Sequence, residues 1–378
     1  MPGPTYRAAR QVAERVQERF AERKATHGGK WREGATQPDT KTIEKIIDVA
    51  FWASLRREEA YSPKISLAYL SPEQAGQPLM FERSLPLTAT ALARLAPAVE
   101  RPGIHLGVWH HEEQLRVWGT TRTIPRRCFV LEVIEPGLLV VKYRRGRDAS
   151  KFVNVVVLKG DEVKEVDEQG TSLPDCPELL TALLGFGSPA TSDEAVNVLV
   201  QLAVSMRAHG RGGSLLVVPQ GSDAWRSSIV RPVSYSVAPQ FTELADLMSQ
   251  SEEKKAEQLW QESFIDAVEA VAGLTAVDGA TVITNRYELL AFGAKIVMRE
   301  GGERADRVVV TEPVVGNVAS VVHPVQLGGT RHLSAAQFVN DQRDAIALVA
   351  SQDGRFTVFA WSPCEETVHA HRVETLLL

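Results

Sequence analysis

The sequence is poor in the residues and runs that mark secreted, membrane-spanning or disulfide-stabilised proteins. It has three cysteines in 378 residues, and Cys128, Cys176 and Cys364 form neither a CxxC motif nor a disulfide framework. No stretch of membrane-spanning length is free of charge, and the charged N-terminal segment lacks the apolar core of a signal peptide. We therefore expect a cytoplasmic protein without membrane contact.

The common catalytic signatures are also missing. The sequence contains no Walker loop, no GxSxG and no HExxH, so the usual nucleotide-hydrolase and hydrolase templates are not supported. A formal net charge of -5 gives no overall attraction to nucleic acid, which we do not expect as a partner. The histidine-rich segments 108–118 and 369–372 lack metal-ligand spacing, because neighbouring residues of a strand point to opposite faces.

Length and hydrophobic periodicity predict two domains. Residues 1–168 begin with helical periodicity and alternate apolar and polar residues from residue 64 onward, which predicts a mostly antiparallel α+β domain. Its second helix would be capped by Asp39 or Thr42. Residues 169–189 have a linker composition, and residues 190–378 form the second predicted domain, with helices followed by returning strands.

The second domain opens with a predicted helix and a buried strand. Ser192 is the expected helix cap, followed by an apolar stripe through Val196, Val200 and Val204. The glycine-rich segment 209–213 is expected to end this helix, and a phosphate loop there is the less favoured interpretation.

Residues 328–338, GGTRHLSAAQF, have the composition of an anion site at the start of a helix. The glycines allow the backbone to approach a ligand closely, and a helix N-terminus presents free N–H groups. Arg331 adds a planar fork suited to phosphate oxygens. A glycine turn before a surface helix explains the same residues, so this segment alone does not decide between the two.

Two segments, in this order, resemble the halves of the diadenylate cyclase domain found in the DNA integrity scanning protein. The first is VDGATVITNRYELLAFGAKI at 277–296, and the second occupies 328–361. The family hallmarks that match are Asp278-Gly279-Ala280 and Gly329-Thr330-Arg331-His332. Together with the helix and strand at 201–218, the resemblance covers about residues 190–370.

The resemblance implies an α/β domain with a central mixed sheet for residues 190–378. It also implies a function and a role for each matched residue. Two such domains face each other, each holding one ATP whose 3′-hydroxyl attacks the α-phosphate of the other, which implies a homo-oligomer. Asp278 would be the catalytic carboxylate and would ligate Mg²⁺ or Mn²⁺ in an active enzyme. The implied nucleotide-binding residues are Gly279, Ala280, Gly329, Thr330, Arg331 and His332.

Two departures from the family pattern point away from turnover. Leu333 stands where the family has a second arginine, and Ala350-Ser351-Gln352-Asp353 contains no glutamate at the family's metal-binding place. Binding a nucleotide needs fewer groups than transferring one. We therefore predict a sensor that binds an adenine nucleotide or cyclic dinucleotide, with cyclase activity weak or absent. The alternative is an active diadenylate cyclase that makes cyclic di-AMP from two ATP.

The N-terminal region supports the sensor interpretation through a second resemblance. Residues 46–70, IIDVAFWASLRREEAYSPKISLAYL, resemble the N-terminal region of a group of sensor proteins built on cyclase-like domains. This resemblance implies a regulatory or sensing role for residues 1–168.

Overall fold

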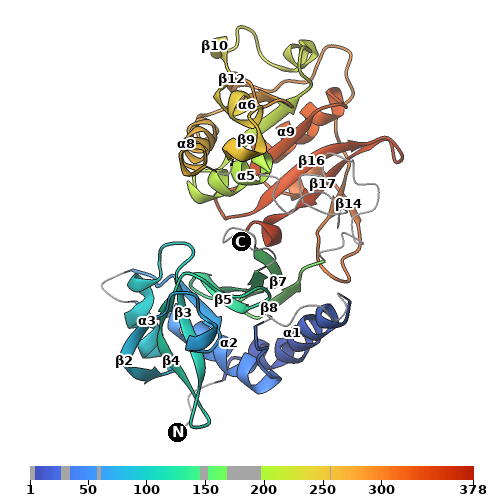
Figure 1. The fold of residues 1–378 in the computed structure, drawn as a ribbon. Helices are drawn as coiled ribbons and strands as arrows, with labels where there is room; N and C mark the ends of the chain where they lie inside the picture. The colour runs from blue at the N-terminus through green and yellow to red at the C-terminus, as the bar shows by residue number, and fades with distance from the viewer. Residues whose placement is uncertain (1–4, 27–34, 58–60, 145–151, 168–196, 256) are drawn as a thin grey trace. The chain divides into compact units, whose positions relative to one another are not determined.

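The computed structural model describes residues 5–26, 35–57, 61–144, 152–167, 197–255 and 257–378. The chain divides into two compact units, each built on its own sheet (Figure 1). Unit 1 is residues 1–166 with Leu378, and unit 2 is residues 167–377. The predicted linker at 169–189 and the predicted cap Ser192 lie outside the described residues.

Unit 1 contains an eight-stranded sheet in the order β2-β4-β3-β1-β5-β6-β7-β8. Its strands are β1 (Ile65–Tyr69), β2 (Leu79–Pro86), β3 (His105–His111), β4 (Gln114–Thr121), β5 (Phe129–Glu135), β6 (Leu138–Arg144), β7 (Phe152–Lys159) and β8 (Glu162–Glu165). Only β1 and β3 pair in parallel, and every other pair is antiparallel. The mostly antiparallel α+β class predicted for this part of the chain is confirmed.

The described residues of unit 1 also form the helices α1 (Arg7–Thr26), α2 (Thr40–Ser54) and α3 (Ala89–Leu95), with short 3-10 turns at Pro72–Gln74 and Ala96–Ala98. The apolar faces of α1 and α2 pack in one core with alternate residues of the strands. Val16 and Ile46 are fully buried there, and so is Leu106 of β3. Because successive residues of a strand point to opposite faces of the sheet, the remaining strand residues face the other side, where a smaller cluster surrounds Trp118 and Cys128.

Unit 2 contains a nine-stranded mixed sheet in the order β10-β12-β11-β9-β15-β16-β17-β13-β14. Its strands are β9 (Gly213–Val218), β10 (Tyr235–Phe241), β11 (Ala280–Thr284), β12 (Leu289–Ala294), β13 (Val308–Thr311), β14 (Ser320–Val322), β15 (Ile346–Ala350), β16 (Phe356–Ser362) and β17 (Thr367–Arg372). The pairs β9–β11 and β13–β17 are parallel, and the others are antiparallel. A central mixed sheet is therefore present, as predicted.

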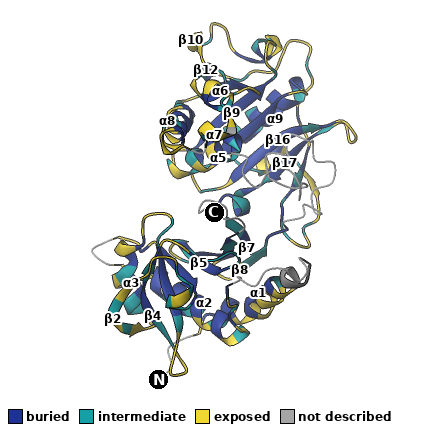
Figure 2. Cartoon of the chain, viewed as in Figure 1, coloured by how far each residue is buried: buried dark blue, intermediate teal, exposed yellow. Residues whose placement is uncertain are grey.

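Helices cover both faces of this sheet. The helices are α5 (Val198–Ala208), α6 (Glu243–Met248), α7 (Glu252–Lys255), α8 (Gln258–Leu274) and α9 (Thr330–Asp341), with 3-10 turns at Ala224–Ser228, Pro324–Gln326 and Glu374–Leu376. Leu215 and Val217 of β9 pack in the core formed with α5, α6 and α8. Leu216 and Val218 pack in the core formed with α9. Figure 2 shows the buried residues gathered along the strands between the helices.

The opening helix of unit 2 differs from its prediction. Asn197 caps α5, accepting a hydrogen bond from the backbone N–H of Val200 at 3.2 Å. Val204, which was expected in the buried stripe, is 40% exposed, whereas Leu202 and Met206 are fully buried. The segment is apolar on two sides, so packing against the sheet, and not the sequence period, selects the inward face. The predicted end of the helix is confirmed, because Gly210 and Gly212 follow it with positive φ.

Across the described part of the chain, no helix combines the length and the apolar character needed to cross a membrane.

The start of α2 provides a test of the fold of unit 1. The Asp39 side chain accepts a hydrogen bond from the backbone N–H of Thr42 at 2.8 Å. The Asp39→Ala change should destabilise α2 by about 1 kcal/mol at pH 7. Hydrogen bonds from the hydroxyl and N–H of Thr42 hold the pKa of Asp39 below its usual value. The difference in stability between the wild type and the Asp39→Ala variant should therefore shrink below about pH 4, as the wild-type carboxylate protonates.

Amide hydrogen exchange over α2 measures this difference. The Asp39→Asn variant, which retains an acceptor oxygen, is the control and should stay close to wild type at pH 7. Equal exchange in the wild type and the Asp39→Ala variant at pH 7 would show that the cap contributes nothing.

Candidate functional site

The two motif segments of unit 2 meet at one end of its sheet. β9 and β11 run parallel with Ser214 beside Ala280, and β15 runs antiparallel to β9 with Ala350 beside Gly213. The starts of β9 and β11 and the end of β15 therefore lie together. The start of α9 lies there too, because a Cβ on Gly212 would be 3.0 Å from Nη1 of Arg331. We call this region the Asp278 end of the sheet.

Asp278 faces a lysine at this end. β11 and β12 pair antiparallel with Ala280 opposite Ala294, so the residues just outside the two strands are brought together. The Nζ of Lys295 donates a hydrogen bond to Oδ2 of Asp278, and the two side chains are 53% and 87% exposed. The hydrogen bond and charge of Lys295, with a smaller contribution from the charge of Arg331, hold the pKa of Asp278 below its usual value. The carboxylate is therefore ionised at neutral pH.

The two small residues after Asp278 are fixed by packing. Gly279 has φ +114, and a Cβ on it would lie 2.4 Å from the carbonyl carbon of Gly293. Ala280 is 1% exposed and belongs to the core on the α9 side of the sheet. The close approach of β11 and β12 therefore already requires a glycine and a small residue, independently of any nucleotide.

Helix α9 places the residues of its first turn on different sides. Gly329 is the N-cap and forms no side-chain capping bond, and Thr330 is exposed. Arg331 is half-buried, and its side chain forms no hydrogen bond or ion pair with the residues that the structure describes. These two side chains are available at the helix start, where free N–H groups add to the attraction for an anion.

His332 does not join Thr330 and Arg331 at the surface. It is 2% exposed, its Nε2 lies 3.5 Å from Oγ1 of Thr357, and its ring is edge-on to Phe359 at 6.0 Å between centroids. Burial lowers its pKa, so it is neutral at pH 7 and is not a cation for phosphate. The reason is helical geometry, since successive side chains of a helix are rotated by about 100°. His332 anchors the helix, and Arg331 is left as the cation of the motif.

Sequence reasoning missed several charged residues at this end. Lys295 is one, and Arg355 is another, with its Nε 3.2 Å from Oδ2 of Asp353. The charges of Asp353, Arg355 and Arg372 all act on the pKa of His332, which places them around the start of α9. The sequence indicates a hairpin after Asp278, but the register of β11 and β12 shifts twice, so counting outward from the turn does not place Lys295 beside Asp278.

The donor set at this end does not fit a divalent metal. Within the described ranges, no group of three or more His, Cys, Asp and Glu side chains is placed to hold a metal ion. Asp278 is engaged by Lys295, and Asp353 by Arg355. The metal role implied for Asp278 would therefore depend on a carboxylate that Lys295 already engages.

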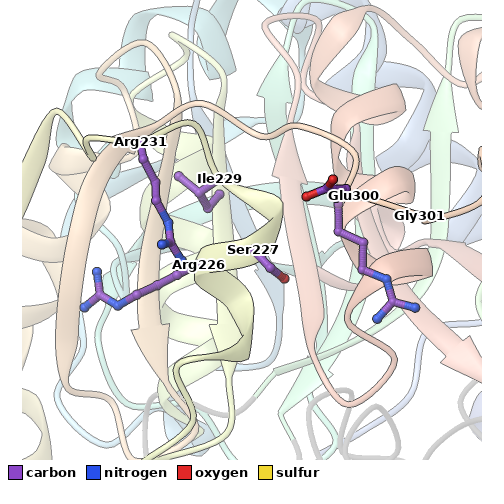
Figure 3. A pocket seen from close by; sticks show the side chains of 7 residues that line it. Arg226, Ser227, Ile229, Arg231, Glu300 and Gly301 are labelled. Carbon is purple, nitrogen blue, oxygen red and sulfur yellow. The ribbon is translucent and has the colours of Figure 1, made fainter.

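A separate polar pocket of about 580 Å³ opens on unit 2 (Figure 3). It is lined by Arg226, Ser227, Ile229, Arg231, Arg299, Glu300 and Gly301. Arg226 is already paired with Asp223 at 2.8 Å and lies over the ring of Trp225. None of the residues predicted from the motifs lines this pocket, so the pocket and the Asp278 end are separate places on unit 2.

Unit 1 holds a buried polar network on its own sheet. Oγ of Ser66 lies 2.7 Å from Nδ1 of His105 and donates to Glu132, which is also paired with Lys142. Burial lowers the pKa of His105 to about 4, so the imidazole is neutral at physiological pH. The charges of Glu132 and Lys142 compensate each other, and the network is a satisfied structural feature.

Comparison with known proteins gives one family match. Residues 32–122 match the model of a family described as the probable sensor domain DACNV. This segment extends from before α2 through β4 of unit 1. The match thus associates unit 1 with a sensor domain of the kind that the resemblance of residues 46–70 predicted. No curated protein matches the chain.

Among solved structures, the chain is similar to the crystal structure of a double mutant of DacA from Staphylococcus aureus. The sequence identity is 12% and the TM-score 0.23, and the match covers 51% of this chain and 89% of that chain.

The packing around Gly279 can be tested directly. The Gly279→Ala change should lower the free energy of unfolding by roughly 1–3 kcal/mol, because the new Cβ meets backbone and φ is positive. Gly273, near the end of α8, would have nothing within 4 Å of an added Cβ. The Gly273→Ala control should be neutral or stabilising by about 0.5–1 kcal/mol. Thermal unfolding of both variants gives the comparison, and a Gly279→Ala protein as stable as wild type would contradict the close approach.

Proposed function

We propose that the Asp278 end of unit 2 binds an adenine nucleotide or a cyclic dinucleotide, and that the protein is a sensor with weak or no cyclase activity. The observation that carries the proposal is that Lys295, which contacts Asp278, and Arg331, which lies beside Gly212, are at the same end of the sheet. These residues come from two separate motif segments, and the fold brings them to one end of the sheet. The adenine preference comes only from the resemblance of 277–296 and 328–361 to the diadenylate cyclase domain.

The chemistry of this end suits phosphate. Arg331 supplies a planar fork without a partner among the described residues, and the first turn of α9 supplies N–H groups that no side chain caps. The ammonium of Lys295 has three donors and gives one to Asp278. Two cations against one carboxylate leave this part of the surface with net attraction for an anion.

The same residues are poorly equipped for cyclisation. Leu333 stands in the first turns of α9, where a second arginine of the family would neutralise charge on the phosphate, and it offers no donor. Asp353, the carboxylate closest in sequence to the missing glutamate, is paired with Arg355. Transfer also needs two nucleotides face to face, so a homo-oligomer stays the expectation for any turnover.

Binding is tested by calorimetry with ATP and with cyclic di-AMP. The Arg331→Ala change should weaken binding by roughly 1–3 kcal/mol, the usual scale for a hydrogen bond to a charged group. The control is Arg286→Ala, because Arg286 is exposed in the turn between β11 and β12 at the far ends of the same strands. If the wild type binds neither compound, the proposal fails.

Turnover is tested by incubating the protein with ATP and Mg²⁺ or Mn²⁺ and separating the products by chromatography. We expect no cyclic di-AMP, or only a trace. Losing one such donor typically slows a reaction by about two to three orders of magnitude, so Leu333→Arg should raise any trace activity. An ordinary enzymatic rate in the wild type, abolished by Asp278→Asn, would establish the alternative function of an active cyclase.

A further inference from the structure

Lys295 is held in place by backbone on two sides. Its preceding residue, Ala294, pairs with Ala280 of β11. Its own carbonyl accepts a hydrogen bond from the backbone N–H of Val230 at 2.8 Å, and the next residue, Ile296, bridges to Ile229. The ammonium therefore starts from a fixed backbone position, and its contact with Asp278 follows from the pairing of the strands.

Asp278 is the carboxylate that the resemblance implies as a metal ligand. Mg²⁺ at a phosphate site is typically held by one or two protein carboxylates together with the phosphates and water. Oδ2 of Asp278 already accepts from Lys295, and no group of three or more metal-ligating side chains occurs among the described residues. A metal at Asp278 would also be repelled by the charges of Lys295 and Arg331.

We propose that the Lys295 ammonium takes the place of a divalent cation, so that unit 2 binds the phosphates of its nucleotide without metal. The inference rests on the proposed function and adds the mode of binding. Asp278 then acts on the ligand only through Lys295: it holds the ammonium at the end of the sheet, and the remaining donors of Nζ reach the phosphate together with Arg331. Asp278 is thus a positioning residue whose own charge opposes the ligand.

The experiment is calorimetry of the full chain with ATP and with cyclic di-AMP, each in excess EDTA and in excess Mg²⁺. We expect equal dissociation constants, within about twofold, in the two conditions. Lys295→Gln should weaken binding in EDTA by about tenfold or more, the scale of one hydrogen bond to a charged group. Lys295→Arg should keep most of the wild-type affinity. The matched control is Lys254→Gln, which changes an exposed lysine of α7.

Asp278→Asn distinguishes the two modes by the sign of its effect. If Asp278 ligated a metal, the change would abolish binding. If it only positions Lys295, the change removes a negative charge near the phosphates and should tighten binding in EDTA by about twofold to tenfold.

Each outcome decides a separate point. Binding that requires Mg²⁺ overturns the metal-free mode and leaves the proposed function intact. Binding in EDTA whose affinity is unchanged by Lys295→Gln has the same two consequences. Loss of binding in Asp278→Asn likewise overturns it. Absence of binding to the wild type in both conditions overturns the proposed function itself. Thermal unfolding of each variant checks that a loss of binding heat is not caused by a loss of folded protein.

Discussion

The parallel pairing of β9 with β11 is the constraint on which the rest of unit 2 depends. Because Ser214 lies beside Ala280, the segments that precede both strands leave the sheet at the same end. β15 then pairs antiparallel with the other side of β9 and brings its own end to that place. β9 is buried on both faces, with α5 and α8 on one side and α9 on the other, so its register is fixed by the core. Residues distant in sequence therefore meet where the strands begin.

A second constraint, the contact of Gly279 with Gly293, sets how closely the flanking hairpin can pack. Without a Cβ on Gly279, the start of β11 lies against the backbone of Gly293 near the end of β12, and the side chains just beyond them come within reach. Gly279 thus has a folding role and also helps to place Asp278 beside Lys295. Packing alone therefore explains the small residues of this motif, whether or not this end of the sheet binds a ligand.

The sequence was sufficient for the features that local chemistry decides. The period of two in the strands, the cap at Asp39, the glycine-rich end of α5 and the start of α9 after a glycine pair were all predictable from residue types. The buried face of α5 was not predictable from residue types. Apolar residues occupy two sides of this helix, and its packing against the sheet decides which side is buried. The burial of His332 and the partnership of Lys295 were missed for a related reason, since both depend on strand pairing and helix rotation in three dimensions.

The charge arrangement explains how a fold of this kind can serve recognition better than transfer. A transfer site must stabilise charge that develops on the phosphate in the transition state, which needs several converging donors and a cation free to follow that charge. At this end of the sheet the ammonium of Lys295 is paired with the Asp278 carboxylate. The side chain of Leu333 has no hydrogen-bond donor at the position where transfer would require one. Under the proposed function, such a site would hold a ground-state phosphate with fixed charges. Occupancy by the nucleotide, and not its conversion, would then be the signal, which agrees with the sensor-domain match in unit 1.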